Sequence, residues 1–175
     1  WHVQPMSMDA LGATKNHEFH AFTPTVSNIK PTSRGYVSII DKDSRIYPKI
    51  KQNYLSTDND RIIAAKGLKL TRKIIMESKT FKKYTPEEYR PGIHINDDEE
   101  LVKEASNYAQ TIFHPVGTCK MGNDEMSVVD EKLKVRGLDN LRVIDASIMP
   151  NITSGNTNAP TIMIAEKGAD MILNQ

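Results

Sequence analysis

The sequence predicts an α+β protein, in which an antiparallel sheet carries packed helices and a C-terminal strand and buried helix follow. Residues 18–50 are rich in β-branched and aromatic residues separated by turn-forming ones, a pattern typical of hairpins. Two later segments, beginning near residues 56 and 96, combine helix-capping residues with apolar residues three or four positions apart. The end of the chain is apolar on most faces of its helical pattern.

The strands are expected in the first third of the chain. Residues 1–17 show no periodicity and are expected to form an irregular lead-in. Residues 18–26 predict a strand that Pro24 confines to an edge or a strand end. Residues 36–40 and 45–50 predict the two arms of a hairpin joined by a short polar loop.

The first long helix is predicted to start at the cluster Ser56-Thr57-Asp58, because these residue types cap helix N-termini. Its expected core stripe lies on the sheet and consists of Ile63, Gly67, Leu70 and Ile74. A glycine inside a helix costs about 1 kcal/mol relative to alanine, so Gly67 indicates close packing.

The acidic run at 96–100 has two interpretations, an interaction tail or the capped start of a second helix. The helix is favoured, because carboxylates suit the positive end of a helix dipole. Its expected core stripe is Leu101, Ala105, Tyr108 and Ile112. We expect this helix to bring His114 to its end, since Pro115 discourages further helix.

The C-terminal third predicts a small hairpin from residues 128–130 and 133–135, then a buried strand at 141–144. Pro160 stands where a proline opens a helix well. The final helix, residues 161–173, is apolar around most of its girth and is expected to be buried between layers.

Composition excludes several classes of function. The chain has 175 residues, 23 basic and 22 acidic, and no basic tract that would bind nucleic acid. One cysteine cannot form an internal disulfide, and no apolar run is long enough to cross a bilayer. The amino end has neither an initiator methionine nor a signal-peptide layout, so we expect a piece of a longer protein.

Two stretches carry the chemistry. The first is Ile112-Phe113-His114-Pro115-Val116-Gly117-Thr118-Cys119-Lys120-Met121-Gly122, and the second runs through residues 141–150 to Ser154-Gly155-Asn156-Thr157-Asn158-Ala159-Pro160-Thr161. Together they resemble the C-terminal signature of the glucose–methanol–choline (GMC) oxidoreductases, flavoenzymes that oxidise alcohols. The branch they resemble most is the animal FAD-dependent glucose dehydrogenase-like one. This resemblance is compatible with a secreted protein, but the sequence does not assign a localisation.

The resemblance implies a domain organisation. Residues 18–125 would form the substrate-binding domain. Residues 126–175 would form the C-terminal part of the FAD-binding domain, whose strand and helix complete a Rossmann-like fold.

The resemblance also implies two catalytic residues. His114 would take the hydroxyl proton of an alcohol or sugar as hydride leaves for FAD, a role that suits an imidazole with an ordinary pKa near 6.5. Asn156 occupies a position that holds histidine or asparagine in the family; it would hydrogen-bond the alcohol oxygen. From the residues alone, a structural or solvated His114 is favoured, and Asn156 could be part of a polar turn.

Cofactor contacts are implied at Asp145 and Ala146, and at the backbone of Thr157 and Asn158. The physical reason is general: a strand end, a loop and a helix start present amides and a positive dipole end to a bound anion.

Three other features have weaker functional interpretations. Cys119 could pair with His114 as a nucleophile, but no supporting motif accompanies it. His17 and His20 could ligate a metal, but no third ligand stands nearby, so no metal site is expected. Asn151 begins a glycosylation sequon in the expected flavin-proximal loop, where we expect it to be unused.

The sequence contains no Gly-x-Gly-x-x-Gly loop to seat a dinucleotide diphosphate. The expected partner is therefore a missing N-terminal FAD-binding half. Two hypotheses stay open: the C-terminal part of an FAD-dependent enzyme, or a non-catalytic binding or scaffold domain that kept the fold. The sequence indicates neither the alcohol nor whether oxygen is the electron acceptor.

Overall fold

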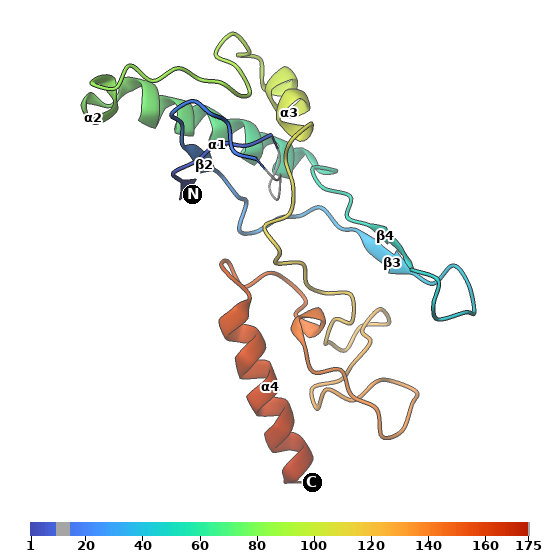
Figure 1. Ribbon diagram of the computed structural model, residues 1–175. Helices are drawn as coiled ribbons and strands as arrows, with labels where there is room; N and C mark the ends of the chain where they lie inside the picture. Colours follow the sequence, from blue (N-terminus) through green and yellow to red (C-terminus); the bar gives the residue numbers. More distant parts are fainter. Residues whose placement is uncertain (10–14, 175) are drawn as a thin grey trace. The chain divides into compact units, whose positions relative to one another are not determined.

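The computed structural model describes residues 1–9 and 15–174, which form two compact units. The first unit contains Trp1–Asn28 and Tyr54–Gln110, and the second contains Ile29–Asn53 and Thr111–Gln175. Figure 1 traces the elements of both in chain order. Part of the predicted irregular lead-in, residues 10–14, lies outside the described residues.

The first unit begins with a two-stranded antiparallel sheet. Strand β1 (His2–Gln4) pairs with β2 (Thr23–Thr25), and Val3 lies opposite Pro24. The strand around Pro24 is short and has only one partner, as expected for a proline that cannot donate to a central ladder. Strand β1 falls inside the segment predicted to be irregular, because three residues are too few to show a period.

Helix α1 (Asp58–Glu77) starts where the capping cluster predicts. The Thr57 side chain accepts a hydrogen bond from the Asp60 amide at 3.3 Å. The predicted core stripe is wrong in its second half, since Leu70 and Ile74 are 44% and 45% exposed. The helix packs against α3 rather than lying on a sheet, so its buried face differs from the face that the apolar stripe predicted.

The close packing predicted at Gly67 is confirmed. A Cβ added there would lie 2.8 Å from Cγ2 of Val26, on the segment that follows β2. An alanine would therefore push the helix away from this segment.

A short helix, α2 (Lys79–Lys82), leads to a connection that is held by a part-buried ion pair. Arg72 donates through Nε and Nη2 to the two carboxylate oxygens of Glu88, at 2.6 and 2.8 Å. Both side chains are 13% exposed. Glu88, mainly through this hydrogen bonding, raises the pKa of Arg72. The pair fixes the loop that follows, because Glu88 also accepts from the Gly92 amide.

Helix α3 (Asp98–Ser106) is the predicted acidic-capped helix. The Asp97 carboxylate accepts from the amides of Glu99 and Glu100, both at 3.0 Å. The expectation that this helix delivers His114 at its end is wrong, because the helix stops at Ser106. The connection up to His114 is irregular, and Phe113 has a φ of +67°, which no helix contains.

The second unit contains the predicted hairpin. Strands β3 (Tyr36–Ser38) and β4 (Lys49–Lys51) are antiparallel, with Val37 opposite Ile50. The loop between them is longer than predicted, and the second arm starts later. Figure 1 shows this hairpin as a narrow ribbon with an open loop at its tip.

The predicted hairpin at 128–135 appears as single bridges, of which one pairs Val129 with Val135. The predicted buried strand at 141–144 is not formed: Arg142 makes one bridge to Lys134, and residues 142–144 are half-buried. The described residues therefore contain small antiparallel sheets and helices, and they do not by themselves form a Rossmann-like sheet.

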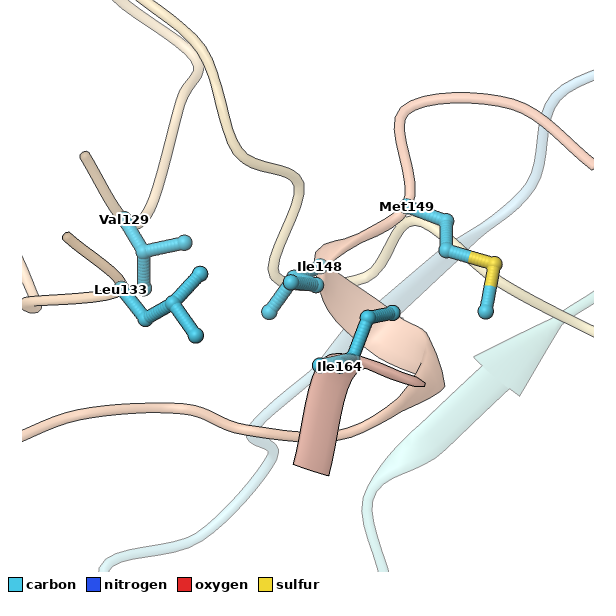
Figure 2. Close-up of a cluster of buried hydrophobic side chains, with 5 residues drawn as sticks. All are labelled: Val129, Leu133, Ile148, Met149 and Ile164. Carbon is cyan, nitrogen blue, oxygen red and sulfur yellow. The ribbon is translucent and has the colours of Figure 1, made fainter. Parts of the chain in front are cut away.

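The core of the second unit lies between these bridges and the last helix, α4 (Asn158–Leu173). Figure 2 shows its five buried side chains, which are Val129, Leu133, Ile148, Met149 and Ile164. Ile148 belongs to a short 3₁₀ helix, η1 (Ala146–Ile148), and Ile164 is one of two buried residues of α4. Ile148 thus lies between the bridged segments and the helix.

Helix α4 begins three residues earlier than predicted, and Pro160 occupies its first turn. The prediction that it is buried on most sides is wrong for this chain. Ile162, Met163 and Leu173 are 55%, 59% and 82% exposed. Contact is close at one point, where a Cβ on Gly168 would lie 2.4 Å from Ile144 Cγ2.

Candidate active site at the start of helix α4

The segment after His114 is fixed along the backbone of residues 147–149. The Cys119 amide donates to the Ser147 carbonyl at 3.0 Å, and the Met121 amide donates to the Ile148 carbonyl at 2.8 Å. Gly117 has a φ of +90°, and a Cβ there would lie 3.3 Å from the Met149 carbonyl oxygen. A glycine is needed because L-residues resist this conformation.

His114 lies against the start of α4. Its Nδ1 is 3.0 Å from the Thr157 hydroxyl oxygen and accepts a longer hydrogen bond, 3.4 Å, from the Thr157 amide. The imidazole is half-buried. Phe113 precedes it in a left-handed conformation, which costs free energy for a residue with a bulky side chain and indicates a constrained turn.

Thr157 is the N-cap residue of α4 but does not use its side chain as a cap. It is 7% exposed, and its hydroxyl makes no hydrogen bond to the amides of its own helix. Its carbonyl accepts from both the hydroxyl and the amide of Thr161, at 2.6 and 3.0 Å. The hydroxyl that would normally cap the helix is directed to His114 instead.

The structure brings the residues at 156–158 to His114 across 43 positions of the chain. Asn156 directly precedes the residue that contacts the imidazole, and both Asn156 and Asn158 are exposed. The first turn of α4 contains no acidic side chain. Its amides therefore keep the positive end of the helix dipole.

Asp145 and Ala146 are at the start of η1. The Asp145 carboxylate accepts from the Ser147 amide at 2.7 Å and so caps this short helix. Asp145 is exposed, and Ala146 is half-buried. One oxygen of this carboxylate is thus used within the chain, which the sequence did not indicate.

A contact between Arg34 and Asn151 was also missed by sequence reasoning. Arg34 donates to the side-chain oxygen of Asn151 at 2.7 Å and to the Pro31 carbonyl at 2.9 Å. It ties the segment before β3 to the loop that contains the expected sequon. No local pattern predicts it, because the two residues are 117 positions apart.

Of the two histidines considered for metal binding, His17 has other contacts and His20 is exposed. His17 lies 3.0 Å from the Ser7 hydroxyl and 3.2 Å from Asp9, and it stacks on Phe19. Within residues 1–9 and 15–174, no three His, Cys, Asp or Glu side chains gather in a way that could hold a metal ion. Cys119 is a half-buried free thiol.

None of the helices in the described part of the chain combines the length and apolar character required to cross a membrane.

An imidazole held at the open start of a helix, beside an exposed asparagine, is an arrangement suited to binding a polar group. Sequence comparison identifies the protein class: residues 31–165 match the GMC oxidoreductase family. The chain belongs to this family, and the matched region is its C-terminal domain. The family resemblance of the two motif stretches is thereby confirmed.

Among curated proteins, the chain is 46% identical over 172 residues to an oxygen-dependent choline dehydrogenase of Pseudomonas syringae pv. tomato. It is 44% identical over 175 residues to the oxygen-dependent choline dehydrogenase of Escherichia coli strain K12. These alignments cover 98% and 100% of this chain but only 30% and 31% of the relatives. The chain therefore spans about a third of their length.

Solved structures of the family have the same fold. Pyridoxine 4-oxidase from Mesorbium loti matches with a TM-score of 0.77 and 36% identity, over 84% of this chain and 28% of that one. A formate oxidase variant from Aspergillus oryzae, studied for FAD modification, matches with a TM-score of 0.76 and 30% identity, over 86% and 28%.

The curated relatives bear on two expectations. They are bacterial choline dehydrogenases, so they support the family but not specifically its animal glucose dehydrogenase-like branch. They are also oxidoreductases of an FAD-dependent family, which agrees with the oxidoreductase and flavoprotein expectation.

Proposed function

We propose that the chain is the C-terminal catalytic portion of an FAD-dependent oxidoreductase that acts on the CH–OH group of its donor. The observation that carries this proposal is the contact between His114 and Thr157, which holds an imidazole beside Asn156 at the open start of α4. The remaining part of the enzyme is proposed to be an N-terminal half that contains the dinucleotide-binding glycine loop.

In this proposal His114 is the general base. A neutral imidazole accepts the hydroxyl proton, and a positioned base of this kind typically contributes about 10²–10⁴-fold in rate. FAD, when bound, supplies the hydride acceptor for the carbon that carries the hydroxyl. The Nδ1 contacts with buried Thr157 leave Nε2 as the ring nitrogen for the alcohol.

Asn156 is proposed to orient the alcohol oxygen. Its amide cannot act as a base, but its NH₂ group donates hydrogen bonds and stabilises negative charge that develops on oxygen. Its exposure next to Thr157 leaves the side chain accessible to a substrate.

The residues at the start of α4 fit an anionic group such as the reduced flavin ring. The first turn lacks both a side-chain cap and an acidic residue, so its amides present positive dipole to a ligand. Thr157, Asn158 and Ala146 would contact the cofactor through their backbone. Asp145 would contribute its carboxylate while still capping η1.

The proposed substrate class is a small alcohol, with choline as the first candidate. The reason is that the bacterial relatives are choline dehydrogenases. A sugar is the second candidate, from the motif resemblance. Residues 18–125 are proposed as the substrate-binding domain and residues 126–175 as part of the FAD-binding domain.

The competing function is a non-catalytic binding or scaffold domain. The enzyme and scaffold hypotheses are distinguished by an experiment on the full-length protein. The protein is loaded with FAD, and choline is added anaerobically. Loss of the oxidised-flavin absorbance supports the enzyme. A protein that binds FAD but whose flavin no alcohol of a broad panel reduces would support the scaffold.

A further inference from the structure

We propose that Thr157 is a positioning residue for His114, and that its hydroxyl is the acceptor that allows the imidazole to carry a proton on Nδ1. The inference rests on the proposed function, because it explains how His114 can serve as a base. It assigns to a helix-capping residue a role in setting the protonation of the ring.

The two hydrogen-bond partners of Nδ1 place different constraints on the position of the ring proton. The Thr157 amide, at 3.4 Å, can only donate, so it favours a ring whose Nδ1 is bare and whose proton is on Nε2. The Thr157 hydroxyl, at 3.0 Å, can donate or accept, so it is compatible with either position of the proton. The hydrogen-bond partners, rather than the ring itself, therefore decide the tautomer.

Only one of these tautomers can act as a base through Nε2. The lone pair on Nε2 must be free, so the neutral ring must hold its proton on Nδ1. When the alcohol oxygen releases its proton to Nε2, the ring becomes a cation with protons on both nitrogens, and the bonding electron pair stays on the alcohol oxygen. Of the two partners, only the hydroxyl can accept the Nδ1 proton, so in these two states the 3.4 Å hydrogen bond from the Thr157 amide to Nδ1 is not made.

The local structure makes the hydroxyl available for this purpose. A threonine at a helix N-cap ordinarily accepts from amides of its own first turn. Here that bond is absent, and the side chain is buried against the imidazole. Bonds from the Thr161 hydroxyl and amide to the Thr157 carbonyl hold the backbone of Thr157 in place beside the imidazole.

The test uses Thr157→Val and Thr157→Ser in the FAD-loaded full-length protein with choline as substrate. Valine keeps the shape and removes the hydroxyl, whereas serine keeps the hydroxyl. We expect Thr157→Val to lower kcat/KM by about 10- to 100-fold, the range found when a metal-bound histidine loses the partner that orients it. Thr157→Ser should retain most of the activity, and flavin content should be unchanged in both.

A second readout does not depend on turnover. In protein labelled with ¹⁵N-histidine, the two ring nitrogens report which of them carries the proton, and His114→Gln identifies the signals. We expect the Nδ1-protonated form to be populated in the unchanged protein and in Thr157→Ser, and to be lost in Thr157→Val. Should Thr157→Val lose FAD, Thr157→Ala removes the same hydroxyl with less bulk and repeats the comparison.

The same tautomer populations in Thr157→Val and the unchanged protein would overturn the inference, as would turnover within about 3-fold. Failure of the proposed function has a different signature: His114→Gln would then oxidise choline as fast as the unchanged protein.

Discussion

The His114 imidazole and the Thr157 hydroxyl meet at 3.0 Å although 43 residues separate them in the chain. This contact joins the loop that contains His114 to the first turn of α4. It therefore fixes the position of the imidazole relative to Asn156 and to the open amides of the helix. The predictions below follow from this arrangement and from the segments that support it.

Asn156→Ala should reduce catalysis without removing the cofactor. Loss of one donor to a developing oxyanion costs about 10²–10³-fold in kcat when the donor acts in the transition state. Steady-state kinetics with choline, together with flavin absorbance, measures both quantities. Asn158→Ala is the control, since only the backbone of Asn158 is assigned a contact. Equal losses from the two variants would contradict a specific role for Asn156.

Gly117→Ala should destabilise the protein by about 1–2 kcal/mol, the cost of a left-handed conformation for an L-residue, plus the contact with the Met149 carbonyl. Urea unfolding of the variant measures the change. Gly137→Ala separates the two causes, because Gly137 has a φ of +76° but open space around its Cβ position. Gly155→Ala has neither feature and should be within about 0.5 kcal/mol of the unchanged protein.

Acid should weaken the loop that follows the His114 motif. Hydrogen bonds from Lys120 and then Ser127 lower the pKa of Asp124 from 3.8 to about 2. A carboxyl with a lower pKa in the folded state stabilises the protein above pH 3.8, and this contribution is lost as pH falls through about 2. Asp124→Asn should flatten the dependence of the melting temperature on pH between about 4 and 2. Lys120→Met should flatten it in part, and an unchanged slope in both variants would rule out this origin.

The 175-residue chain alone should not retain FAD, because it contains no glycine loop for the diphosphate. Titration of the purified chain with FAD, followed by flavin fluorescence, tests this. Joining the chain to the proposed N-terminal half should restore one bound FAD. Micromolar binding to the chain alone, at one-to-one stoichiometry, would show that its own residues suffice.

The sequence predicted those elements whose signals are local. Thr57 and Asp97 indicated the starts of α1 and α3, and Pro160 indicated the first turn of α4. Each of these signals depends on hydrogen bonds within one helical turn. The hairpin of β3 and β4 was also predicted from a local signal, its β-branched and aromatic residues, although its loop length was not.

The errors came from features that depend on distant partners. Helix α3 ends at Ser106 and Phe113 is left-handed, although the apolar period continues through Tyr108 and Ile112. The exposure of Ile162 and Met163 on α4 could not be read from the apolar pattern, which shows only that faces of the helix can be buried.

The candidate site was predicted in its residues but not in its contacts. His114, Asn156 and Thr157 were named from the family motif, and their roles stay predictions. The hydroxyl contact of Thr157 was not foreseen, since a threonine before a helix normally indicates a cap. Only the folded structure shows that the Thr157 side chain contacts His114 instead of capping its own helix.

The central claim, that His114 is the base in alcohol oxidation, is tested most directly by His114→Ala in the FAD-loaded full-length protein. The measured quantity is kcat/KM for choline, with flavin content as the control for cofactor binding. The proposal predicts a decrease of about 10²–10⁴-fold with unchanged flavin. Turnover within a few-fold of the unchanged protein would contradict it.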